Sequence, residues 1–575
     1  MSAPQMSGAA HSAHGASNRG LVAGALPGVP FGRFGQMFDA PPAKKATDAA
    51  LKDLALAMIK ADEGAGITTA EPIDENPAIP SGYTYFGQFV DHDITFDPTP
   101  LAAADRDNRA VEDFRSPALD LDSVYGRGPD DQPYLYVPKS GGKLRVGSAP
   151  GNAGAAVGTK HDVFRLDDKT PLLGDKRNDE NKIVSQIHGG FIALHNKVMG
   201  MDALLLQFGF DPAHPGTRFR AAAKLVRWHY QWVVVHDYLE RITEPGMVTE
   251  VLNPGGMPRI GHYIKSNAPY AYMPVEFAGA AFRFGHSQVR PSYALNNVVM
   301  TAKRPNLDPA KERIPTFSNN THPVPEEDRD AQNLNGFPGP LVPFWGIDWS
   351  FYFDGLPKPA QPFKDKDGKT AVLPQPGYRI DALLTEPLAD LPEFFDPRRK
   401  PADIKLSPIG NLAFRNLVRG QNLGLPSGQA VASILGIVPL SDDVLWDAGS
   451  RLMQPAALDE EDGHAFQATR AARAAVRAKW VANGGVFAGN APLWYYVLRE
   501  AEYYGVTHVQ DDLAIGFGGQ HLGPVGSRIV AETLVGLLWT DTSSFLHDLR
   551  GFRPLPEIAQ GKPLTVGRLL AFALT

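Results

Sequence analysis

The chain has 575 residues, a formal net charge of -7 at pH 7 and no cysteine. Without cysteine it cannot form disulfide bonds, thiolate metal sites, iron–sulfur clusters or a thiolate-ligated haem, and cysteine catalysis is excluded. The mild negative charge, from 56 basic and 63 acidic residues, argues against nucleic-acid binding and is ordinary for a soluble enzyme.

Residues 1–30 are rich in Gly, Ala, Ser and His and are predicted to form a flexible tail. They lack a charged start followed by an apolar stretch, so they do not resemble a secretory signal. No run approaches the roughly 18 to 20 apolar residues of a membrane span. We therefore expect a soluble protein without a membrane span, which is either cytoplasmic or exported by a route that needs no recognisable signal.

Apolar residues recur at helical spacing in several long stretches, which outnumber convincing strands. The first begins after a cap at Thr47 or Asp48, and the second begins near Arg177 and continues towards Leu206. The others span residues 217–241, 409–420, 427–436, 465–482, 491–503 and 523–540. This pattern predicts a mainly α fold with little β structure.

Two regions, 304–345 and 355–379, are rich in Pro, Asn, Gly and Asp and are predicted to be irregular surface loops. Neither separates segments of different composition, and no repeat is visible. We therefore predict a single domain over residues 31–575 with long loop insertions. The alternative is a pair of domains that meet near residue 304.

Residues 87–93 read Gly-Gln-Phe-Val-Asp-His-Asp, with Phe96 just beyond. In a helix, Gln88 and His92 share one face, whereas Asp91 and Asp93 point elsewhere. The functional interpretation is a His92 that transfers protons in a polar pocket, with the two carboxylates free for covalent or metal bonds. The alternative is a helix end with solvated acids and a hydrogen-bonded histidine.

Residues 174–180 read Gly-Asp-Lys-Arg-Asn-Asp-Glu and precede a predicted helix. Arg177 and Glu180 are three residues apart, so at a helix start both can project from one side. The guanidinium of Arg177 would be permanently charged and suited to an anionic or polarised oxygen. Taken alone, the segment is equally explained as a capped helix start with a surface ion pair.

Residues 282–286 read Phe-Arg-Phe-Gly-His. Arg283 and His286 share a helical face, and the aromatic residues and the glycine allow a flat group to approach closely. A neutral imidazole in such a place is a natural ligand for iron. The alternative is a buried histidine that is satisfied by a backbone carbonyl.

Residues 116–126 contain an alternating pair of acids, Asp120 and Asp122, before a Tyr-Gly stop. Together with Ser116 and backbone carbonyls they could supply oxygen ligands to a hard cation, and calcium fits that chemistry. The spacing is not that of an EF-hand, so the residues alone leave open a simple acidic turn.

In chain order, these four segments and the stretch from Arg415-Asn416 to Gly424-Leu425-Pro426 resemble the animal-type haem peroxidase family of the peroxidase–cyclooxygenase superfamily. The resemblance extends from about Tyr83 to Gly536. The sequences of residues 119–128 and 492–502 are most similar to those of the bacterial branch of this family. The resemblance implies a myeloperoxidase-like fold, a large helical domain around a buried haem.

The resemblance implies roles for the first two segments. His92 matches the distal histidine, Arg177 the distal arginine, and Gln88 a glutamine that lines the distal pocket and helps to bind halide. Asp91 and Glu180 match two carboxylates that form ester bonds to haem methyl groups, so a covalently attached haem b is expected. Asn181 stands where myeloperoxidase has a sulfonium-forming methionine, so that third link should be absent.

On the proximal side, His286 matches the axial ligand of the haem iron and Arg283 an arginine beside the haem. The family places an asparagine behind the proximal histidine and an arginine three residues later, and Asn416 and Arg419 fit that spacing. The amide of Asn416 is expected to accept a hydrogen bond from His286 and to fix its orientation. The alternative for Asn416 and Arg419 is an ordinary polar helix face.

The resemblance also implies a calcium site, which would couple the distal helix to the acidic loop. Its ligands would be Asp93, Ser116, the carbonyl of Ala118, Asp120 and Asp122. Asp122 replaces a serine of the mammalian enzymes, which should make the site more negative.

The expected function is that of a haem peroxidase that reduces hydrogen peroxide through a ferryl intermediate and oxidises halide, thiocyanate or phenolic donors. Fatty-acid dioxygenases of the same superfamily carry a tyrosine three residues before the proximal histidine. Arg283 stands there and cannot form the corresponding radical, so a peroxidase is preferred. The other alternative, a non-catalytic calcium-binding matrix protein, predicts loss of His92, Arg177 or His286, and all three are present.

Overall fold

The computed structural model carries side chains and describes most of the chain after the first 33 residues. The predicted tail therefore lies outside the described residues, as do parts of both predicted loop regions. The described ranges are 34–60, 74–96, 113, 115–151, 155–264, 271–301, 313–317, 333–336, 339–341, 344–357, 373–392, 410–458, 460–506 and 516–575.

The described part of the fold is mainly helical, as the sequence predicts. The longer helices are α1 Asp48–Ala57, α2 Gly82–Ile94, α4 Lys182–Val198, α6 Thr217–Val233, α13 Leu412–Asn422, α16 Glu460–Trp480, α17 Leu493–Tyr504, α18 Pro524–Thr540 and α20 Val566–Leu574. The short helices are α3 Asp122–Tyr125, α5 Asp202–Leu206, α7 Glu240–Ile242, α8 Met247–Leu252, α9 Val275–Gly279, α10 Asn297–Thr301, α14 Gly428–Ile434, α15 Asp442–Leu445 and α19 Pro556–Ala559.

Strands are few and short, and they pair only in twos within the described residues. The parallel pair is β1 Phe34–Gly35 with β3 Met273–Pro274. The antiparallel pairs are β2 Glu75–Pro80 with β6 Pro376–Tyr378, and β4 Ser292–Tyr293 with β5 Ile314–Pro315. In the described residues these strand pairs connect loops to the helices and do not form a larger sheet.

The helix predicted after Thr47 is confirmed, and the Thr47 side chain accepts a hydrogen bond from the N–H of Ala50 at 3.3 Å. The prediction of a helix from near Arg177 is wrong at its start. Residues Lys176–Asp179 form a separate 3₁₀ turn, and α4 begins at Lys182. Asn181 lies between them in extended conformation and caps α4 by accepting from the N–H of Ile183 at 2.8 Å, which is typical of an N-cap.

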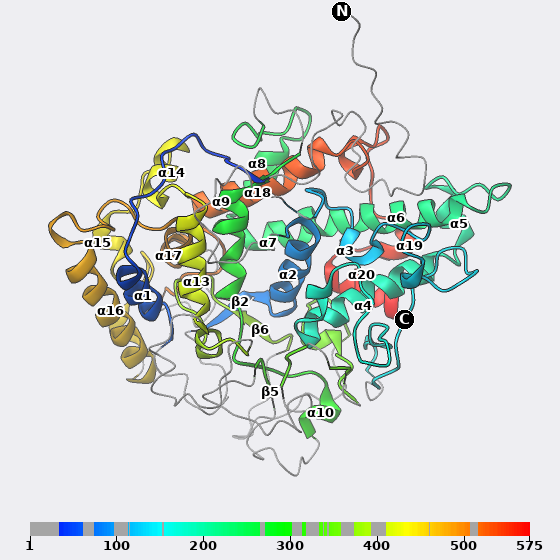
Figure 1. The fold of residues 1–575 in the computed structure, drawn as a ribbon, viewed down its shortest axis with the longest axis horizontal. Coiled ribbons are helices and arrows are strands. Elements are labelled where there is room, and N and C mark those ends of the chain that lie inside the picture. The colour runs from blue at the N-terminus through cyan, green and yellow to red at the C-terminus, as the bar shows by residue number, and fades with distance from the viewer. Residues whose placement is uncertain are drawn as a thin grey trace, which may run out of the picture.

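Helix α2 runs through the middle of the molecule, between α4 on one side and the segment after α9 on the other (Figure 1). Its apolar side chains explain this position, since Phe86, Phe89 and Val90 are fully buried. Phe89 stacks on Phe191 of α4 with ring centroids 4.8 Å apart. The polar residues that alternate with this apolar set are thereby held inside the protein.

The predicted helix over residues 217–241 is confirmed in position but changes its winding. After α6, residues Val234–Leu239 form a π-helical turn, and α7 completes the element. A π turn inside a helix shifts every later side chain around the axis. His229 lies before this turn, in α6, and His236 lies within it. His229 is buried and bonds the carbonyl of Leu225 at 2.7 Å, whereas His236 lies against the Trp232 ring.

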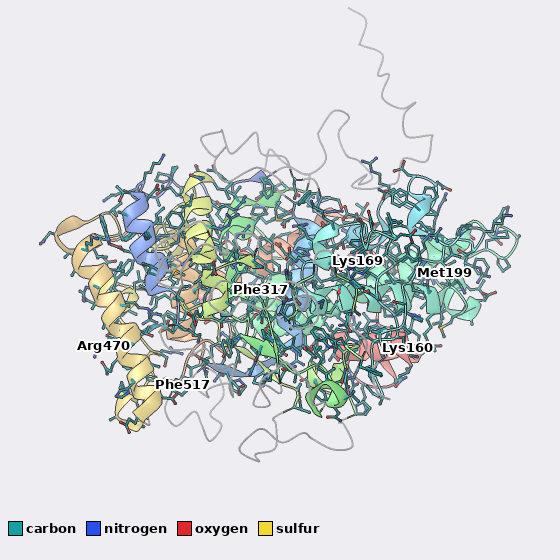
Figure 2. The ribbon with its side chains drawn as sticks, turned by 60° about the horizontal axis from the view of Figure 1, so that its bottom comes forward. Lys160, Lys169, Met199, Phe317, Arg470 and Phe517 are labelled. Atoms are coloured by element: carbon teal, nitrogen blue, oxygen red, sulfur yellow. The ribbon has the colours of Figure 1, made fainter. Side chains whose placement is uncertain are left out.

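The arginines of α16 do not all face solvent, although an alanine-rich helix with spaced arginines is usually solvated along that face. Helix α16 lies along one edge of the molecule, and Arg470 is exposed there (Figure 2). Arg473 is instead 1% exposed and forms an ion pair with Glu502 of α17 at 2.8 Å. The sequence of α16 does not show that Arg473 faces inward, because its partner Glu502 lies on another helix.

No helix in the described part of the chain is long and apolar enough to cross a membrane. The prediction of a single domain over residues 31–575 is not tested by these observations and stays a prediction.

Candidate active site

Helix α2 brings Gln88 and His92 to one polar face, as their spacing predicts. Both side chains meet Glu180, which follows the 3₁₀ turn Lys176–Asp179. Gln88 Nε2 donates to Glu180 Oε1, and His92 Nε2 lies 3.5 Å from the same oxygen. An amide, an imidazole and a carboxylate from two separate segments thus share one small space.

Glu180 remains a carboxylate in this setting. Burial alone would raise its pKa, but the contact with His92, the charge of Arg177 and the hydrogen bond of Gln88 hold the pKa below its usual value. The side chain of Glu180 is 37% exposed, whereas that of His92 is only 5% exposed. The acid therefore marks the open side of the polar space, and the histidine forms its inner wall.

The far side of the His92 ring is fixed by an amide. Nδ1 of His92 lies 2.9 Å from Oδ1 of Asn178, and Nδ2 of Asn178 lies 3.0 Å from Nδ1 of His188 on α4. His92, Asn178 and His188 are at most 4% exposed. Burial lowers the pKa of His188 to about 3, so this second histidine is neutral at physiological pH.

Arg177 lies beside this group but is already well bonded. Its Nη2 forms an ion pair with Asp175 at 2.8 Å and donates to the carbonyls of His92 at 3.1 Å and Thr95 at 2.5 Å. The guanidinium also lies 4.6 Å from the centre of the Phe96 ring. These contacts tie Arg177 to the C-terminal end of α2, so it holds the end of that helix beside the polar space.

The second histidine of the candidate site, His286, ends the 3₁₀ turn Ala281–His286, here called η7. Burial first and the charge of Arg283 second lower its pKa to about 3. Its Nδ1 lies 2.9 Å from Nδ2 of Asn416 on α13, while Nη1 of Arg283 donates to Oδ1 of Asn416 at 3.1 Å. A neutral, orientated imidazole results, which is a suitable ligand for a metal.

The contact of Asn416 with His286 differs from the expectation in one respect. We expected the amide oxygen to accept from His286, but the amide nitrogen faces the ring and the oxygen is taken by Arg283. An amide nitrogen only donates, so Nδ1 of His286 accepts in this arrangement. The guanidinium of Arg283 explains the difference, because it attracts the amide oxygen to its own side.

Helix α2 and η7 pack against each other, with Tyr238 of the π turn between them. The Tyr238 ring lies 6.3 Å from that of Phe282 and 5.5 Å from that of Phe86. A Cβ at Gly87 would lie 2.2 Å from the Tyr238 hydroxyl. Gly87 therefore lets the tyrosine reach α2, which fixes the distance between the two histidine-bearing segments.

The acidic loop brings three carboxylates together. Ligand oxygens of Asp93, Asp120 and Asp122 all lie within 4.8 Å of one another. Burial, followed by the charges of Asp120 and Asp122, raises the pKa of Asp93 well above its usual range, and burial with Asp122 raises that of Asp120 to about 7. Such crowding of buried oxygens suits a hard divalent cation.

The remaining predicted ligands surround this cluster. Ser116 Oγ donates to Asp120 Oδ2 at 2.9 Å, and the N–H of Ala118 donates to the carbonyl of Ser116 at 2.7 Å. The loop turns at Leu121, which adopts the left-handed conformation at φ 59°, and α3 begins at Asp122. That turn directs the Leu121 and Ser123 N–H groups at Asp93, at 3.1 and 3.5 Å.

Two charged residues connect the acidic loop to the polar space. Arg115 forms ion pairs with Asp122 at 3.0 Å and with Asp175 at 2.8 Å. Asp175 in turn pairs with Arg177, and the two arginines hold its pKa far below the usual range against the effect of burial. A continuous chain of charges thus joins the cation-type cluster to the end of α2.

Two further predicted residues lie at the margins. Asp91 accepts a hydrogen bond from Thr95 Oγ1 at 3.1 Å. Arg419 lies in the last turn of α13 and is half-buried. The structure therefore brings Gln88, His92 and Glu180 together, while Asp91 bonds Thr95 and Arg419 lies on α13.

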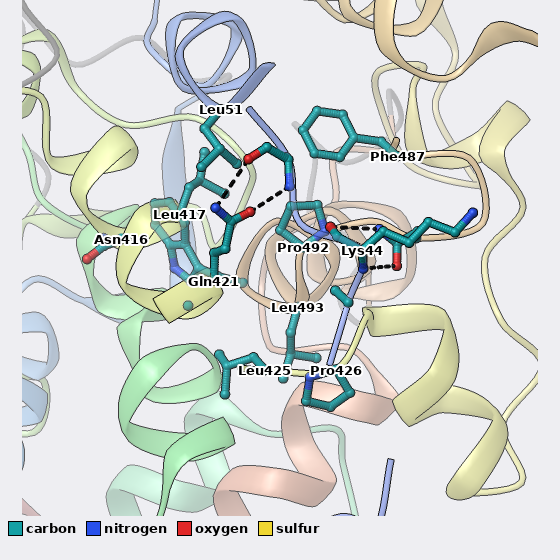
Figure 3. Close-up of a pocket in the computed structure, with 15 residues that line it drawn as sticks. Lys44, Leu51, Asn416, Leu417, Gln421, Leu425, Pro426, Phe487, Pro492 and Leu493 are labelled. Carbon is teal, nitrogen blue, oxygen red and sulfur yellow. Dashed lines mark hydrogen bonds between the residues drawn. The ribbon is translucent and has the colours of Figure 1, made fainter. Parts of the chain in front are cut away.

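A pocket lies behind Asn416, where α13 faces α17 and residues 43–51 (Figure 3). The Gln421 side chain accepts from the N–H of Ala46 at 2.7 Å and donates to its carbonyl at 3.2 Å. Asn490 accepts from the N–H of Lys44 at 3.1 Å. These amides hold the main chain of residues 44–46, so the polar groups of the pocket serve the fold.

Sequence reasoning passed over Arg115, Asp175, Asn178 and His188. Asp175 and Asn178 stand in the segment that was singled out, yet only Arg177 and Glu180 were given roles there. His188 carries no local signal, because its partner lies in the turn before α4 and not at helical spacing. Only the folded chain brings these four residues to the candidate site.

Comparisons of sequence agree with these observations. Residues 105–326 match the domain described as animal haem peroxidase. Thyroid peroxidase of Mus musculus is 29% identical over 188 residues, which cover 30% of this chain and 19% of that relative. The matched part thus spans about a fifth of the length of this curated relative. The domain match contains the acidic loop, Arg177, Glu180 and His286, whereas His92 and Asn416 lie outside it.

Comparisons of structure extend over nearly the whole chain. Peroxidase A from Dictyostelium discoideum aligns with a TM-score of 0.51 at 14% identity, covering 92% of this chain and 89% of that one. The fatty acid alpha-dioxygenase of Oryza sativa aligns with a TM-score of 0.50 at 13% identity, covering 95% and 80%. At such low identity these likenesses describe the fold alone, and they do not choose between the two chemistries.

Proposed function

We propose that this chain, whose residues 105–326 match the animal haem peroxidase domain, is a haem-dependent peroxidase that reduces hydrogen peroxide and oxidises small donors. The observation that carries the proposal is the state of His92. Its Nδ1 is bonded to the Asn178 oxygen, and its Nε2 faces the polar space that contains Gln88 and Glu180. A buried imidazole with one committed and one available nitrogen is equipped to move protons.

In the proposed reaction His92 takes a proton from hydrogen peroxide at Nε2 and returns it to the departing oxygen. Nδ1 keeps its own proton throughout, since it is bonded to Asn178. The Gln88 amide orients polar ligands in the same space. Arg177 contributes positive charge close by and stabilises negative charge that develops on oxygen. General acid–base assistance of this kind accelerates reactions by about 10²- to 10⁴-fold.

The residues of the site fit a haem group. The neutral imidazole of His286 would hold the iron, because burial keeps it unprotonated at physiological pH. Coordination through Nε2 requires the proton on Nδ1, and a half-turn of the Asn416 amide presents its oxygen to that proton. When bound, the haem supplies the electrons that reduce peroxide. The protein would supply the ligand and the proton carrier.

We also propose that haem is attached through ester bonds at Glu180 and Asp91. Glu180 supports this better than Asp91, because its carboxylate lies in the polar space beside His92. Mass spectrometry of the denatured, haem-loaded protein tests the attachment. Haem mass on the peptides of Glu180 and Asp91 is the expected result, and complete release of haem on denaturation would contradict it.

The acidic cluster is proposed to hold calcium through Asp93, Asp120 and Asp122, with Ser116 and the Ala118 carbonyl. The crowding of three carboxylates within 4.8 Å supports a cation. Bound calcium stabilises only the folded state, so chelation should lower the melting temperature. The variant Asp120→Asn should abolish that response to a chelator. An equal response in both proteins would contradict the assignment.

A fatty-acid dioxygenase is the second candidate, and the likeness of fold to the Oryza sativa enzyme is its support. Arg283 opposes it, since its guanidinium is bonded to Ala278 and Asn416 in the place where the dioxygenase expectation requires a tyrosine. Oxygen uptake with an unsaturated fatty acid and peroxide turnover with a phenolic donor separate the two. Faster oxygen uptake would favour the dioxygenase.

Reconstitution with haem tests the proposal as a whole. The purified protein should take up haem with a Soret band and should then oxidise a phenolic donor or a halide in the presence of peroxide. Absence of a Soret band would remove the peroxidase proposal and favour a non-catalytic protein of the same fold. Halide, thiocyanate and phenolic donors compared at equal concentration rank the donors.

A further inference from the structure

A buried chain of three side chains backs the candidate proton carrier. It runs from Nδ1 of His92 to Oδ1 of Asn178 at 2.9 Å and from Nδ2 of Asn178 to Nδ1 of His188 at 3.0 Å. Asn178 is fully buried in the turn before α4, and His188 is 1% exposed on α4 itself. Asn178 reaches the polar space through His92, and His188 lies behind Asn178, so both are placed to act through the His92 ring.

The chemistry of the amide decides where the proton of His92 lies. An amide oxygen only accepts hydrogen bonds, so Nδ1 of His92 must donate and carry the proton. Nε2 then keeps its lone pair and is available to accept a proton. With the amide reversed, Nδ1 would accept, the proton would sit on Nε2, and a neutral His92 could not act as a base there.

Glu180 opposes this arrangement, because a carboxylate near Nε2 favours a proton on that nitrogen. The distances indicate which contact prevails. Nε2 of His92 lies 3.5 Å from Glu180, at the limit of a hydrogen bond, whereas Nδ1 lies 2.9 Å from Asn178. The hydrogen bond of His92 with Asn178 is therefore stronger than its contact with Glu180.

His188 determines the orientation of Asn178. The amide nitrogen of Asn178 faces Nδ1 of His188 and donates to it when that nitrogen carries no proton, which leaves the amide oxygen directed at His92. Burial keeps His188 neutral at physiological pH, so it adds no positive charge beside His92. Phe89 of α2 packs edge-on against the His188 ring at 6.2 Å and limits its rotation.

We propose that Asn178 and His188 are positioning residues that hold His92 in the tautomer with its proton on Nδ1, ready to accept a proton at Nε2. The inference rests on the proposed peroxidase function for its catalytic consequence, but the tautomer itself is independent of that function. Outer residues that orient a functional histidine typically change activity by about 10- to 100-fold when removed.

Nitrogen-15 NMR of histidine-labelled protein tests the tautomer, with the His92 signals assigned by their loss in His92→Gln. The wild-type protein, with and without haem, should show a protonated Nδ1 and an unprotonated Nε2 on His92. A protonated Nε2 with a bare Nδ1 would overturn the proposal, whatever the activity of the enzyme. A correct tautomer in a protein that fails to react with peroxide would instead reject the proposed function alone.

Variants then connect the tautomer to the rate. Asn178→Leu should mix the two His92 tautomers and slow the reaction of the haem-loaded enzyme with peroxide by about 10- to 100-fold, at unchanged haem content. His188→Leu should have a smaller effect in the same direction. His188→Gln should restore the rate, because its amide oxygen accepts from Asn178.

His195→Leu is the matched control. His195 is a fully buried histidine on the same helix, but it bonds Tyr125 and Gly142 instead of Asn178. Its loss should lower the melting temperature without altering the His92 signals or the peroxide rate. If His195→Leu slowed the reaction as much as Asn178→Leu, or if Asn178→Leu left the signals unchanged, the positioning role would be refuted.

Discussion

The two histidines of the candidate haem site each bond an asparagine, but the two amides are turned in opposite directions. On the distal side the Asn178 oxygen faces His92 Nδ1 at 2.9 Å. On the proximal side the Asn416 nitrogen faces His286 Nδ1, also at 2.9 Å. The difference arises from the next partner, which is an accepting histidine behind Asn178 and a donating guanidinium behind Asn416.

Under the proposed function, this contrast leaves the His92 side ready to accept a proton, whereas the His286 side is arranged around Arg283. His92 has its Nε2 free to accept a proton without any rearrangement. His286 reaches the tautomer that binds iron only after the Asn416 amide turns and Arg283 finds another acceptor. Haem binding should therefore change the proximal pair and leave the distal pair as it is.

The largest effect is expected from His286→Ala, which removes the proposed iron ligand. The variant should fail to develop the Soret band on addition of haem, because the remaining contacts give the iron no axial nitrogen. An absorbance titration with haem measures this. Retention of a wild-type Soret band would show that another residue holds the iron. It would then contradict the different roles proposed for His286 and His92.

His92→Ala should behave in the opposite way, binding haem normally but reacting slowly with peroxide. Loss of a general acid–base group predicts a decrease of about 10²- to 10⁴-fold in the rate constant. Stopped-flow absorbance after mixing with peroxide measures it. An unchanged rate would remove His92 from the mechanism, and the His195→Leu variant controls for loss of a buried histidine.

Asn416→Leu should weaken haem binding by about 10- to 100-fold, because it removes the group that orients His286. Asn416→Asp should retain most of the affinity, since a carboxylate can accept from His286 and from Arg283 together. Haem titration of both variants measures the difference. Equal losses would indicate that the amide acts by packing alone and would weaken the argument for its rotation.

The smallest effect concerns stability and lies outside both histidine pairs. Burial raises the pKa of Glu500 to about 8, where the N–H of Val525 donates to it at 2.9 Å. Its folded form thus keeps a proton that the unfolded chain loses near pH 4.5. Folding stability therefore falls as pH rises from about 5 to 8.

Glu500→Gln removes this contribution, because a neutral amide does not titrate. Urea unfolding at pH 5 and pH 8.5 should show a smaller loss of stability in the variant than in the wild-type protein. Other buried acids with raised pKa values, such as Asp381 at about 7, contribute equally to both and cancel in the difference. Parallel losses in the two proteins would contradict the assignment.

Much of the helical structure can be predicted from the sequence, because capping residues and apolar spacing lie within the helix that they mark. Thr47 and the apolar spacing after it predicted α1, and the long periodic stretches predicted α13, α16, α17 and α18. The start of α4 was misplaced, because Asn181 interrupts the pattern with one extended residue that capping chemistry explains only afterwards. The π turn after α6 could not be predicted, because one extra residue in a single turn changes the apolar periodicity too little to be recognised.

The candidate site was predictable only in part. The four segments and the resemblance they support gave His92, Glu180, His286 and Asn416 their expected partners or neighbours. They gave no hint that the Asn416 amide faces the other way, because that depends on a hydrogen bond from Arg283. The same is true of His188, which matters through tertiary contact alone.

The position of Glu180 between Gln88 and His92 has a consequence for how the enzyme would mature. A carboxylate carries the negative charge of this space and repels small anions. An ester carries none, and its oxygens are weaker acceptors for the amide and imidazole beside it. Attachment of haem at Glu180 would thus also switch the ionic character of the pocket, so that a freshly loaded protein and a fully processed one should differ in their affinity for halide.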